Sequence, residues 1–197
     1  TSSYQASNIK SDESSSTFTL NGSTFKVPVP GEVFIYNALA SIAVGELLDL
    51  SLEQIKSGIE NFSMSGNRMK KIVTDKYTII NDTYNANPDS MKSIIKTLEN
   101  FKTRRVAILG DMLELGSYEK ILHESVGEYL NGKVDVLVTV GSLSKYIYDK
   151  FNGVKYHFEN LEQAYAHVKN ILKPGDTIVL KASHSVELDK LLYVIEK

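Results

Sequence analysis

The segment NDTYNANPDSM, residues 81–91, brings carboxylate, amide and phenol groups together directly after an apolar run. Its second half, NPDS, has the composition of a helix start: an asparagine N-cap, a proline at the first helical position and an aspartate that favours the helix dipole. No turn requires Asp82, Tyr84 or Asn85, and polar groups are costly to bury without partners. These three side chains therefore suggest contact with a ribose or a peptide-like ligand, with an ordinary capped loop as the alternative.

Two further loops carry charged side chains after apolar runs. In LGDMLELGS, Asp111 and Glu114 offer two carboxylates, which suit an ammonium group or a cation; alternatively Asp111 forms a turn and Glu114 is solvated. In KASHS, Lys181 suits a carboxylate or a phosphate, or is a solvated charge, while Ser183 is the possible cap of the last helix. Each loop thus has a binding interpretation and a structural one.

The usual signatures of phosphate and metal sites are absent from the sequence. Neither GxxxxGK[ST] nor GxGxxG occurs, so a nucleotide would find no glycine-rich backbone cradle for its phosphates. Arg68 lies in a short polar segment and is interpreted either as an anion-binding residue or as a surface residue. No metal site is predicted, because metal-ligand spacing is missing among the four histidines, which are His123, His157, His167 and His184.

The composition is that of an ordinary globular protein. Of the 197 residues, 42% are hydrophobic and 23% are charged, and the net charge of -2 argues against a nucleic-acid or anionic-membrane surface. The absence of cysteine fits a reducing compartment, so we expect a cytoplasmic protein. No apolar run approaches the roughly 18 residues of a membrane span.

The first third of the chain predicts a β-hairpin followed by two helices. Alternating runs at Thr17–Leu20 and Thr24–Val29 are joined by an Asn-Gly pair, which is typical of a tight hairpin turn. A helix is predicted over Asn37–Leu50, and a second one begins after Ser51, with Gln54 completing a capping box. We expect one apolar face on the first helix, which would drive self-association where it is uncovered; its residues are Leu39, Ile42, Ala43 and Leu47.

A domain boundary is predicted in the polar segment SMSGNRMKK, and strands alternate with helices after it. Continuous apolar strands such as VDVLVTV indicate an open, doubly wound and mostly parallel α/β sheet that is covered on both faces. The predicted strands are Lys71–Thr74, Thr78–Ile80, Val106–Leu109, Val134–Val140 and Thr177–Leu180. The predicted helices are Pro88–Asn100, Tyr118–Leu130, Leu143–Phe151, Leu161–Leu172 and Val186–Ile195.

Several of these segments, in this order and at about this spacing, resemble the Mur ligases. The matching segments are PGEVFIYNALASIAVGELL, GNRM, NDTYNANPDSM, LGDMLELG with the downstream LHESVG, and GDTIVLKAS. The resemblance runs from about Ser15 to the end of the chain, and it is strongest to the member that adds D-Ala-D-Ala in peptidoglycan synthesis. It implies that residues 1–64 are the C-terminal remnant of the central ATP-binding domain and that residues 65–197 are the C-terminal Rossmann-like domain.

The resemblance also implies a reaction. In the family, ATP converts the carboxylate of UDP-N-acetylmuramoyl-tripeptide into an acyl phosphate, which the amine of D-Ala-D-Ala then attacks. The P-loop and the Mg²⁺ ligands of the family would lie upstream of Thr1, so we expect ATP and Mg²⁺ to serve the full-length enzyme and this chain alone to be inactive. The full-length enzyme is expected to be a monomer.

Positions of the family match residues of this chain one by one. Asn37 matches the asparagine near the adenine, Arg68 the arginine that reaches the ATP phosphates, and Asp82 the aspartate that holds the ribose. The substrate-facing positions are Tyr84, Asn85 and Asn87 beside the nucleotide and the dipeptide, Asp111 and Glu114 facing D-Ala-D-Ala, and Lys181 and Ser183 at the mouth of the last strand.

Two other interpretations stay open from the sequence. The chain would be a non-catalytic binding or interaction module if it kept the fold and lost the reaction, and an upstream P-loop in the same gene would favour the enzyme instead. A folate or amide ligase relative is the third interpretation, which NDTYNANPDSM and LGDMLELG disfavour.

Overall fold

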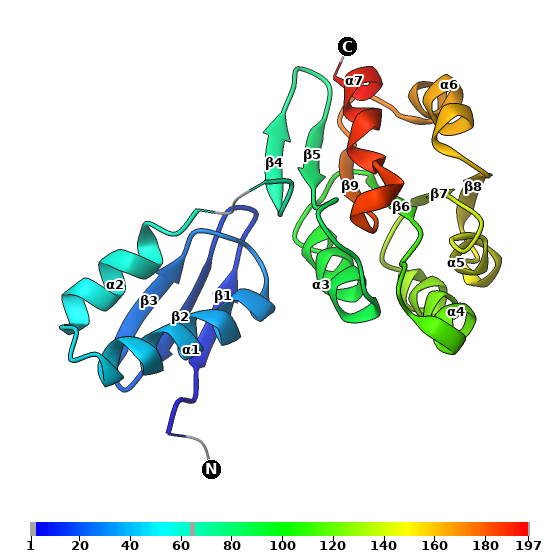
Figure 1. The fold of residues 1–197 in the computed structure, drawn as a ribbon. Helices are drawn as coiled ribbons and strands as arrows, with labels where there is room; N and C mark the ends of the chain where they lie inside the picture. Colours follow the sequence, from blue (N-terminus) through cyan, green and yellow to red (C-terminus); the bar gives the residue numbers. More distant parts are fainter. Residues whose placement is uncertain (1–2, 64–65, 197) are drawn as a thin grey trace. The chain divides into compact units, whose positions relative to one another are not determined.

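The structure is a computed structural model that describes residues 3–63 and 66–196. The chain divides into two compact units, residues 1–64 and residues 65–197, drawn from blue to cyan and from green to red in Figure 1. The polar segment in which the sequence predicts a boundary includes residues 64 and 65, which lie outside the described residues.

The first unit is a three-stranded antiparallel sheet with two helices packed on it (Figure 1). Its elements are β1 (Ser7–Ser11), β2 (Ser16–Leu20), β3 (Ser23–Val27), α1 (Glu32–Leu47) and α2 (Leu52–Glu60). The predicted hairpin is confirmed: Phe18 pairs with Phe25, and Asn21 and Gly22 both have the positive φ that a tight two-residue turn requires, 49° and 80°. The capping box of Ser51 and Gln54 is also present.

The buried face of α1 differs from the predicted one. Ile35, Leu39 and Ile42 are buried against the sheet, whereas Leu47 is 82% exposed. The prediction for Leu47 is wrong because this residue lies five positions after Ile42, about 140° around the helix. The predicted face is therefore covered at Leu39 and Ile42, and the exposed apolar side chains of α1 include Leu47 and Val44.

The second unit confirms the predicted fold class. It is an α/β unit with a six-stranded sheet in the order β4-β5-β9-β6-β7-β8, in which only the β4–β5 pairing is antiparallel. The strands are β4 (Lys70–Val73), β5 (Thr78–Asn81), β6 (Arg105–Gly110), β7 (Val136–Val140), β8 (Val154–Phe158) and β9 (Thr177–Lys181). The helices are α3 (Pro88–Leu98), α4 (Glu119–Leu130), α5 (Lys145–Lys150), α6 (Leu161–Ile171) and α7 (Leu192–Ile195), with short 3₁₀ helices at Gly116–Tyr118, His184–Val186 and Leu188–Leu191.

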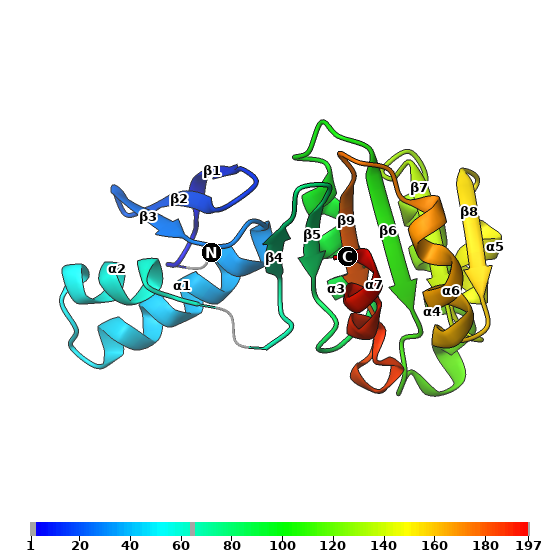
Figure 2. The same cartoon turned by 90° about the horizontal axis from the view of Figure 1, so that it is seen from above.

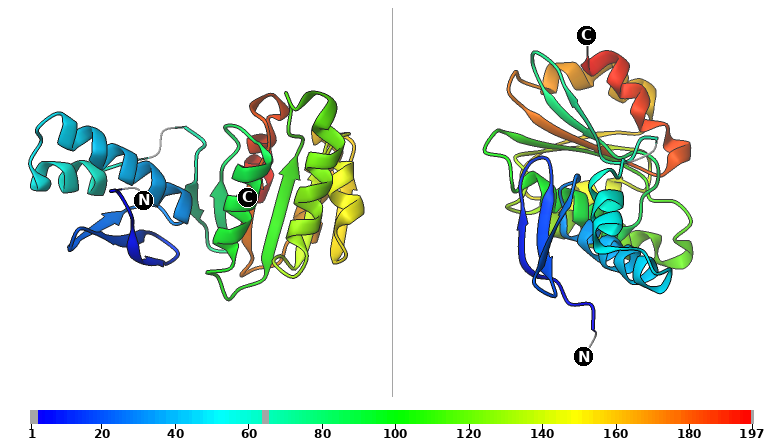
Figure 3. Two further views of the ribbon diagram at one scale, coloured as in Figure 1. Left: turned by 90° about the horizontal axis from the view of Figure 1, so that it is seen from below. Right: turned by 90° about the vertical axis from the view of Figure 1, so that its left-hand side faces the viewer.

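Helices cover both faces of this sheet, as the continuous apolar strands predict. In β6, Ala107 and Leu109 join the core under α3, α4 and α5, whereas Val106 and Ile108 join the core under α6 and α7. Figure 2 shows α6 and α7 in front of the sheet, and the opposite view at the left of Figure 3 shows α3 and α4 in front of it. Within the described residues, no helix has both the length and the apolar character that a membrane crossing needs.

The order of the strands brings three loops to one edge of the sheet. The last strand, β9, lies between β5 and β6 and runs parallel to both. The carboxyl ends of parallel strands share one edge, which is where ligands bind in open α/β sheets. The loops after β5, β6 and β9 are therefore neighbours, although they begin at residues 82, 111 and 182.

A glycine on α4 tests how closely the helices of the second unit pack. A Cβ on Gly127 would lie 2.4 Å from the carbonyl oxygen of Ile147 on α5, and that backbone atom cannot move away easily. In contrast, Gly58 on α2 has no atom within 4 Å of such a Cβ. We predict that Gly127→Ala lowers the free energy of unfolding of the second unit by about 1–3 kcal/mol. Gly58→Ala should raise that of the first unit by up to about 1 kcal/mol.

Denaturant unfolding followed by NMR signals of each unit measures both changes. A Gly127→Ala variant as stable as the parent chain would contradict the close packing of α4 on α5.

Candidate functional site

The centre of the site is an ion pair between the loop after β5 and the end of β9. The ammonium of Lys181 donates to Oδ2 of Asp82 at 2.5 Å and to the carbonyl oxygen of Asn85 at 2.7 Å. The other carboxylate oxygen of Asp82, Oδ1, accepts from the backbone N–H of Met69 at 3.1 Å. Asp82 thus joins three segments, those that contain Met69, Asn85 and Lys181.

Lys181 is a buried cation, with only 2% of its surface exposed. Burial lowers the pKa of its ammonium from the usual value, the carboxylate of Asp82 opposes this shift, and the charge of Arg68 adds to it. Of the two interpretations of Lys181 from the sequence, the solvated charge is therefore wrong. Its carboxylate partner lies within the chain itself, at Asp82.

Aromatic and cationic groups stack next to this pair. The guanidinium carbon of Arg68 lies 3.9 Å from the ring centre of Tyr84, a cation–π contact. The ring of His184 meets the ring of Tyr84 edge-on, with centroids 6.0 Å apart. The stack is at the surface, since Tyr84 is 44% exposed and Arg68 is exposed as well. Arg68, Tyr84 and His184 are brought together although 116 positions separate the first from the last.

The two asparagines of the loop differ in how their side chains are used. The side chain of Asn87 accepts from the backbone N–H of Ser90 at 2.8 Å and caps α3, as its position before a proline predicts. Asn85 is exposed, and its Oδ1 accepts from the neighbouring backbone N–H of Ala86 at 2.8 Å. In each asparagine the side-chain oxygen is bound to a backbone N–H, and the amide nitrogen carries two further donors.

A second group of residues fixes the loop after β6. The carboxylate of Asp111 is buried and accepts from the backbone N–H of Ser144 at 2.6 Å, at the start of α5. The hydroxyl of Ser183 accepts from the backbone N–H of Leu113 at 2.9 Å, and its own N–H donates to the carbonyl of Asp111 at 3.0 Å. Ser183 makes no side-chain cap to the following 3₁₀ helix, so its role as a helix cap is wrong. Both side chains support the loop.

His123 was missed as a functional candidate from the sequence. Its side chain is fully buried, and its Nε2 accepts from the backbone N–H of Met112 at 2.9 Å. Burial lowers the pKa of its ring, and the carbonyl of Glu119 and the charges of Asp111 and Glu119 oppose the shift. A signal was present: His123 occupies the same helical face as the buried Val126, Gly127 and Leu130, and a polar side chain on such a face needs partners.

Glu114 is the exposed carboxylate of this loop. Its φ of 64° lies in the left-handed region, which is costly for a residue with a side chain. Because Asp111, Met112 and Leu113 are all anchored on its amino-terminal side, the loop holds Glu114 at the surface in that conformation.

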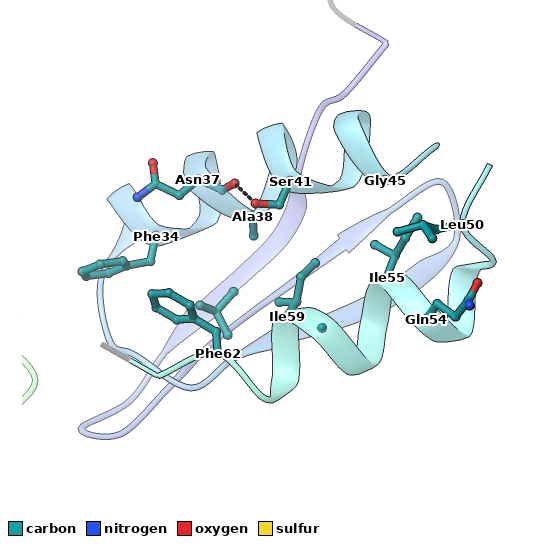
Figure 4. Close-up of a pocket in the computed structure, with 12 residues that line it drawn as sticks. Phe34, Asn37, Ala38, Ser41, Gly45, Leu50, Gln54, Ile55, Ile59 and Phe62 are labelled. Carbon is teal, nitrogen blue, oxygen red and sulfur yellow. Dashed lines mark hydrogen bonds between the residues drawn. The ribbon is translucent and has the colours of Figure 1, made fainter. Parts of the chain in front are cut away.

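Asn37 belongs to the first unit, on the exposed side of α1. It lies beside a largely apolar cavity of about 250 Å³ between α1 and α2, whose walls include Phe34, Ile59 and Phe62. Figure 4 shows the side-chain amide of Asn37 turned away from α2, while the backbone carbonyl of Asn37 accepts from the hydroxyl of Ser41 at 3.0 Å. The amide therefore lies at the margin of the cavity.

The ion pair of Lys181 and Asp82 provides a test of what holds these loops. We predict that Lys181→Met lowers the free energy of unfolding of the second unit by about 3 kcal/mol, because the carboxylate of Asp82 loses its cation. Adding Asp82→Asn should recover part of the loss, since the two residues are coupled. The exposed Lys102→Met serves as the matched control and should change stability by less than about 0.5 kcal/mol.

Denaturant unfolding of the parent chain, the two single variants Lys181→Met and Asp82→Asn, and the double variant measures the coupling energy. A loss in the double variant equal to the sum of the losses in the two single variants would show that the pair does not hold the loops together.

Comparisons with known proteins find relatives over almost the whole of this chain. The UDP-N-acetylmuramoyl-tripeptide–D-alanyl-D-alanine ligase of Bacillus subtilis is 33% identical over 203 residues, covering 96% of this chain and 44% of that protein. A MurF crystal structure from Acinetobacter baumannii is similar with a TM-score of 0.90 and 26% identity, over 97% of this chain and 44% of the other. MurF ligase from Thermotoga maritima, solved in complex with ADP, has a TM-score of 0.82 and 24% identity over 97% of this chain and 45% of its own.

This chain therefore spans less than half the length of these relatives. The family description "Mur ligase, glutamate ligase domain" matches residues 67–184, which contain the loops after β5 and β6 and the end of β9. Since that match extends over more than half of the 197 residues, the chain belongs to the Mur ligase family.

Proposed function

We propose that this chain is part of an ATP-dependent ligase that joins D-Ala-D-Ala to UDP-N-acetylmuramoyl-tripeptide. The observation that carries the proposal is the meeting of three loops at the carboxyl edge of β5, β9 and β6, with Arg68, Asp82 and Glu114 on them or beside them. The naming of the relatives as D-alanyl-D-alanine ligases supports the choice of dipeptide.

Asp82 and Arg68 are assigned to the nucleotide. Each oxygen of the Asp82 carboxylate has one partner in the structure, and a carboxylate offers about four lone-pair sites in all. It can therefore also accept from the two hydroxyls of a ribose. The guanidinium of Arg68 lies over the ring of Tyr84, and a guanidinium in a cation–π contact can still donate from its N–H groups to phosphate oxygens. The ADP bound to the Thermotoga maritima relative is consistent with a nucleotide in this family.

Asn37 is assigned to the adenine. An asparagine amide has both a donor and an acceptor, which is the combination that an adenine edge requires. The margin of an apolar cavity on the first unit is a suitable environment, because the faces of a purine ring are apolar. This assignment stands on residues of the first unit alone.

The loop after β6 is assigned to the dipeptide. Glu114 is the exposed carboxylate there, and its charge would attract the ammonium end of D-Ala-D-Ala. Asp111 acts through the loop that it anchors, because its Oδ1 is already bound to the start of α5. Tyr84 and Asn85, exposed on the neighbouring loop, supply a phenol and an amide for the remainder of the peptide.

The chemistry follows from the weakness of a carboxylate as an electrophile. ATP supplies the phosphoryl group that converts the tripeptide carboxylate into an acyl phosphate, and the dipeptide amine displaces phosphate to form the amide bond. Residues of this chain would hold the nucleotide and the amine in place, which accounts for much of the rate in such reactions. Among the described residues, no group of three or more His, Asp and Glu side chains could hold a metal ion, so no Mg²⁺ ligand is assigned to this chain.

Separate NMR titrations with ATP and with D-Ala-D-Ala test these assignments. We predict that ATP shifts the amide signals of Arg68 and of residues 82–87, and that D-Ala-D-Ala shifts those of residues 111–114. Asp82→Asn should weaken ATP binding about tenfold by removing a charged hydrogen-bond acceptor. The matched control, Asp75→Asn, lies at the exposed turn between β4 and β5 and should bind ATP as the parent chain does.

ATP-induced shifts away from Arg68, residues 82–87 and the surroundings of Asn37, or equal effects of the two aspartate substitutions, would contradict the nucleotide assignment.

A ligation assay separates the binding role from catalysis. We predict that the purified 197-residue chain, given ATP, Mg²⁺, the UDP-tripeptide and D-Ala-D-Ala, forms no ADP and no ligated product, because it has no GxxxxGK[ST] phosphate-binding loop. Ligand-induced shifts without turnover are the expected combination for one part of a larger enzyme. Product formation by this chain alone would overturn the prediction.

A further inference from the structure

A buried histidine holds the loop that carries Glu114. We propose that His123 is a positioning residue, whose neutral ring fixes the backbone of residues 111–114 in the conformation that receives the amino end of a dipeptide. This inference rests on the proposed function, because it takes that loop as the dipeptide-facing one. Nothing in it requires His123 to touch a substrate.

The contacts of the ring determine which nitrogen carries the proton. Nδ1 of His123 lies 2.6 Å from the carbonyl oxygen of Glu119, and a carbonyl oxygen only accepts, so Nδ1 must be the donor. Nε2 lies 2.9 Å from the backbone nitrogen of Met112, which only donates. Nε2 must therefore keep its lone pair. The ring is neutral, with the proton on Nδ1, and both nitrogens are paired.

The geometry connects this ring to the exposed part of the loop. The N–H of Met112 is bound to His123, and the N–H of Leu113 is bound to the hydroxyl of Ser183. These two anchors come from different elements, α4 and the segment after β9. Glu114 follows directly in the left-handed conformation. If the first anchor is released, the backbone before Glu114 keeps the contacts of Asp111 and Leu113 but loses its link to α4.

Protonation removes the anchor. A charged imidazole donates from both nitrogens, so Nε2 and the N–H of Met112 would face each other as two donors. The ring is fully buried, which disfavours its charged form, while the charged groups that act on it, Asp111 at the end of β6 and Glu119 on its own helix, favour that form. The folded chain therefore takes up this proton less readily than the unfolded chain, and the anchor is lost only as the pH falls through the lowered pKa of the ring, which lies below the ordinary value of about 6.5.

Two substitutions distinguish the role of the Nε2 hydrogen-bond acceptor of His123 from the effect of protonating its ring. In His123→Gln, the side-chain oxygen can take the place of Nε2 as the acceptor, and the group stays neutral at every pH. In His123→Leu, the acceptor is lost and the buried volume is largely kept. His167→Gln on α6 is the matched control, because His167 is an exposed histidine that stacks on Phe158.

Hydrogen exchange and NMR on the 197-residue chain test the anchor. We expect a through-bond coupling between the nitrogen of Met112 and Nε2 of His123 in the parent chain at pH 8. The protection factor of the Met112 amide should fall about fivefold or more as the His123 ring becomes protonated, which the ring's own NMR signals report, in the parent chain and in His167→Gln. It should be independent of pH in His123→Gln and low at every pH in His123→Leu.

A protection factor that does not change while the His123 ring of the parent chain becomes protonated would overturn the proposal, and so would parent-like protection in His123→Leu. If His123→Leu fails to fold, the pH comparison between the parent chain and His123→Gln still decides.

Binding of D-Ala-D-Ala at pH 8 then tests whether this anchor supports dipeptide binding. We expect parent-like affinity in His123→Gln and about tenfold weaker binding in His123→Leu, with unchanged ATP-induced shifts at residues 82–87 in both. Dipeptide binding that is equally strong in the parent chain and in His123→Leu would refute the positioning role alone. No dipeptide binding by the parent chain would refute the proposed function of this loop, while the exchange data would still decide whether His123 anchors it.

Discussion

The ammonium of Lys181 joins the end of β9 to the loop after β5, and the arrangement of the site depends on this contact. β9 is the last strand in the chain and lies between β5 and β6. Asp82 and Lys181 are separated by 99 positions in the sequence. The loop after β5 can take its final form only when β9 is in place, because its carboxylate and the carbonyl of Asn85 bind a group that β9 supplies. Such non-local contacts are slow to form.

The same arrangement explains why a lysine is tolerated in the interior. An ammonium buried without partners would be costly, but Lys181 has a carboxylate and a carbonyl at short distance. The carboxylate is in turn bound by the N–H of Met69, whose own φ of 47° is unusual for a residue with a side chain. The strained backbone at Met69 places Arg68 next to it, over the ring of Tyr84. The buried ammonium of Lys181 is thus linked, through Asp82 and Met69, to the exposed guanidinium of Arg68.

Local patterns were sufficient to predict the elements of the second unit whose apolar runs are continuous. The central strands β5, β6, β7 and β9 and all five helices agree with the predictions to within two residues at most ends, although the last helix is divided into a 3₁₀ and an α segment. β8 was missed because it is an edge strand of five residues whose Val154 and Tyr156 are 55% and 40% exposed. β1 was missed because all five of its residues are exposed, so it is defined by backbone pairing that no side-chain pattern reports.

The site illustrates a different limit, because family position and local pattern say which residues matter but not which of their atoms are already in use. Asn87, Asp111 and Ser183 look like ligand contacts by position, yet their oxygen atoms bind the backbone N–H groups of Ser90, Ser144 and Leu113. Tyr84 and Glu114 are polar as well, and they are exposed. Asn87 makes the local cap that its place before a proline predicts, but Asp111 and Ser183 bind segments 33 and 70 positions away, which no local pattern contains. A polar residue at a strand end therefore supports the loop when its side chain satisfies a buried backbone N–H of a distant segment, and it is available to a ligand when it stays exposed.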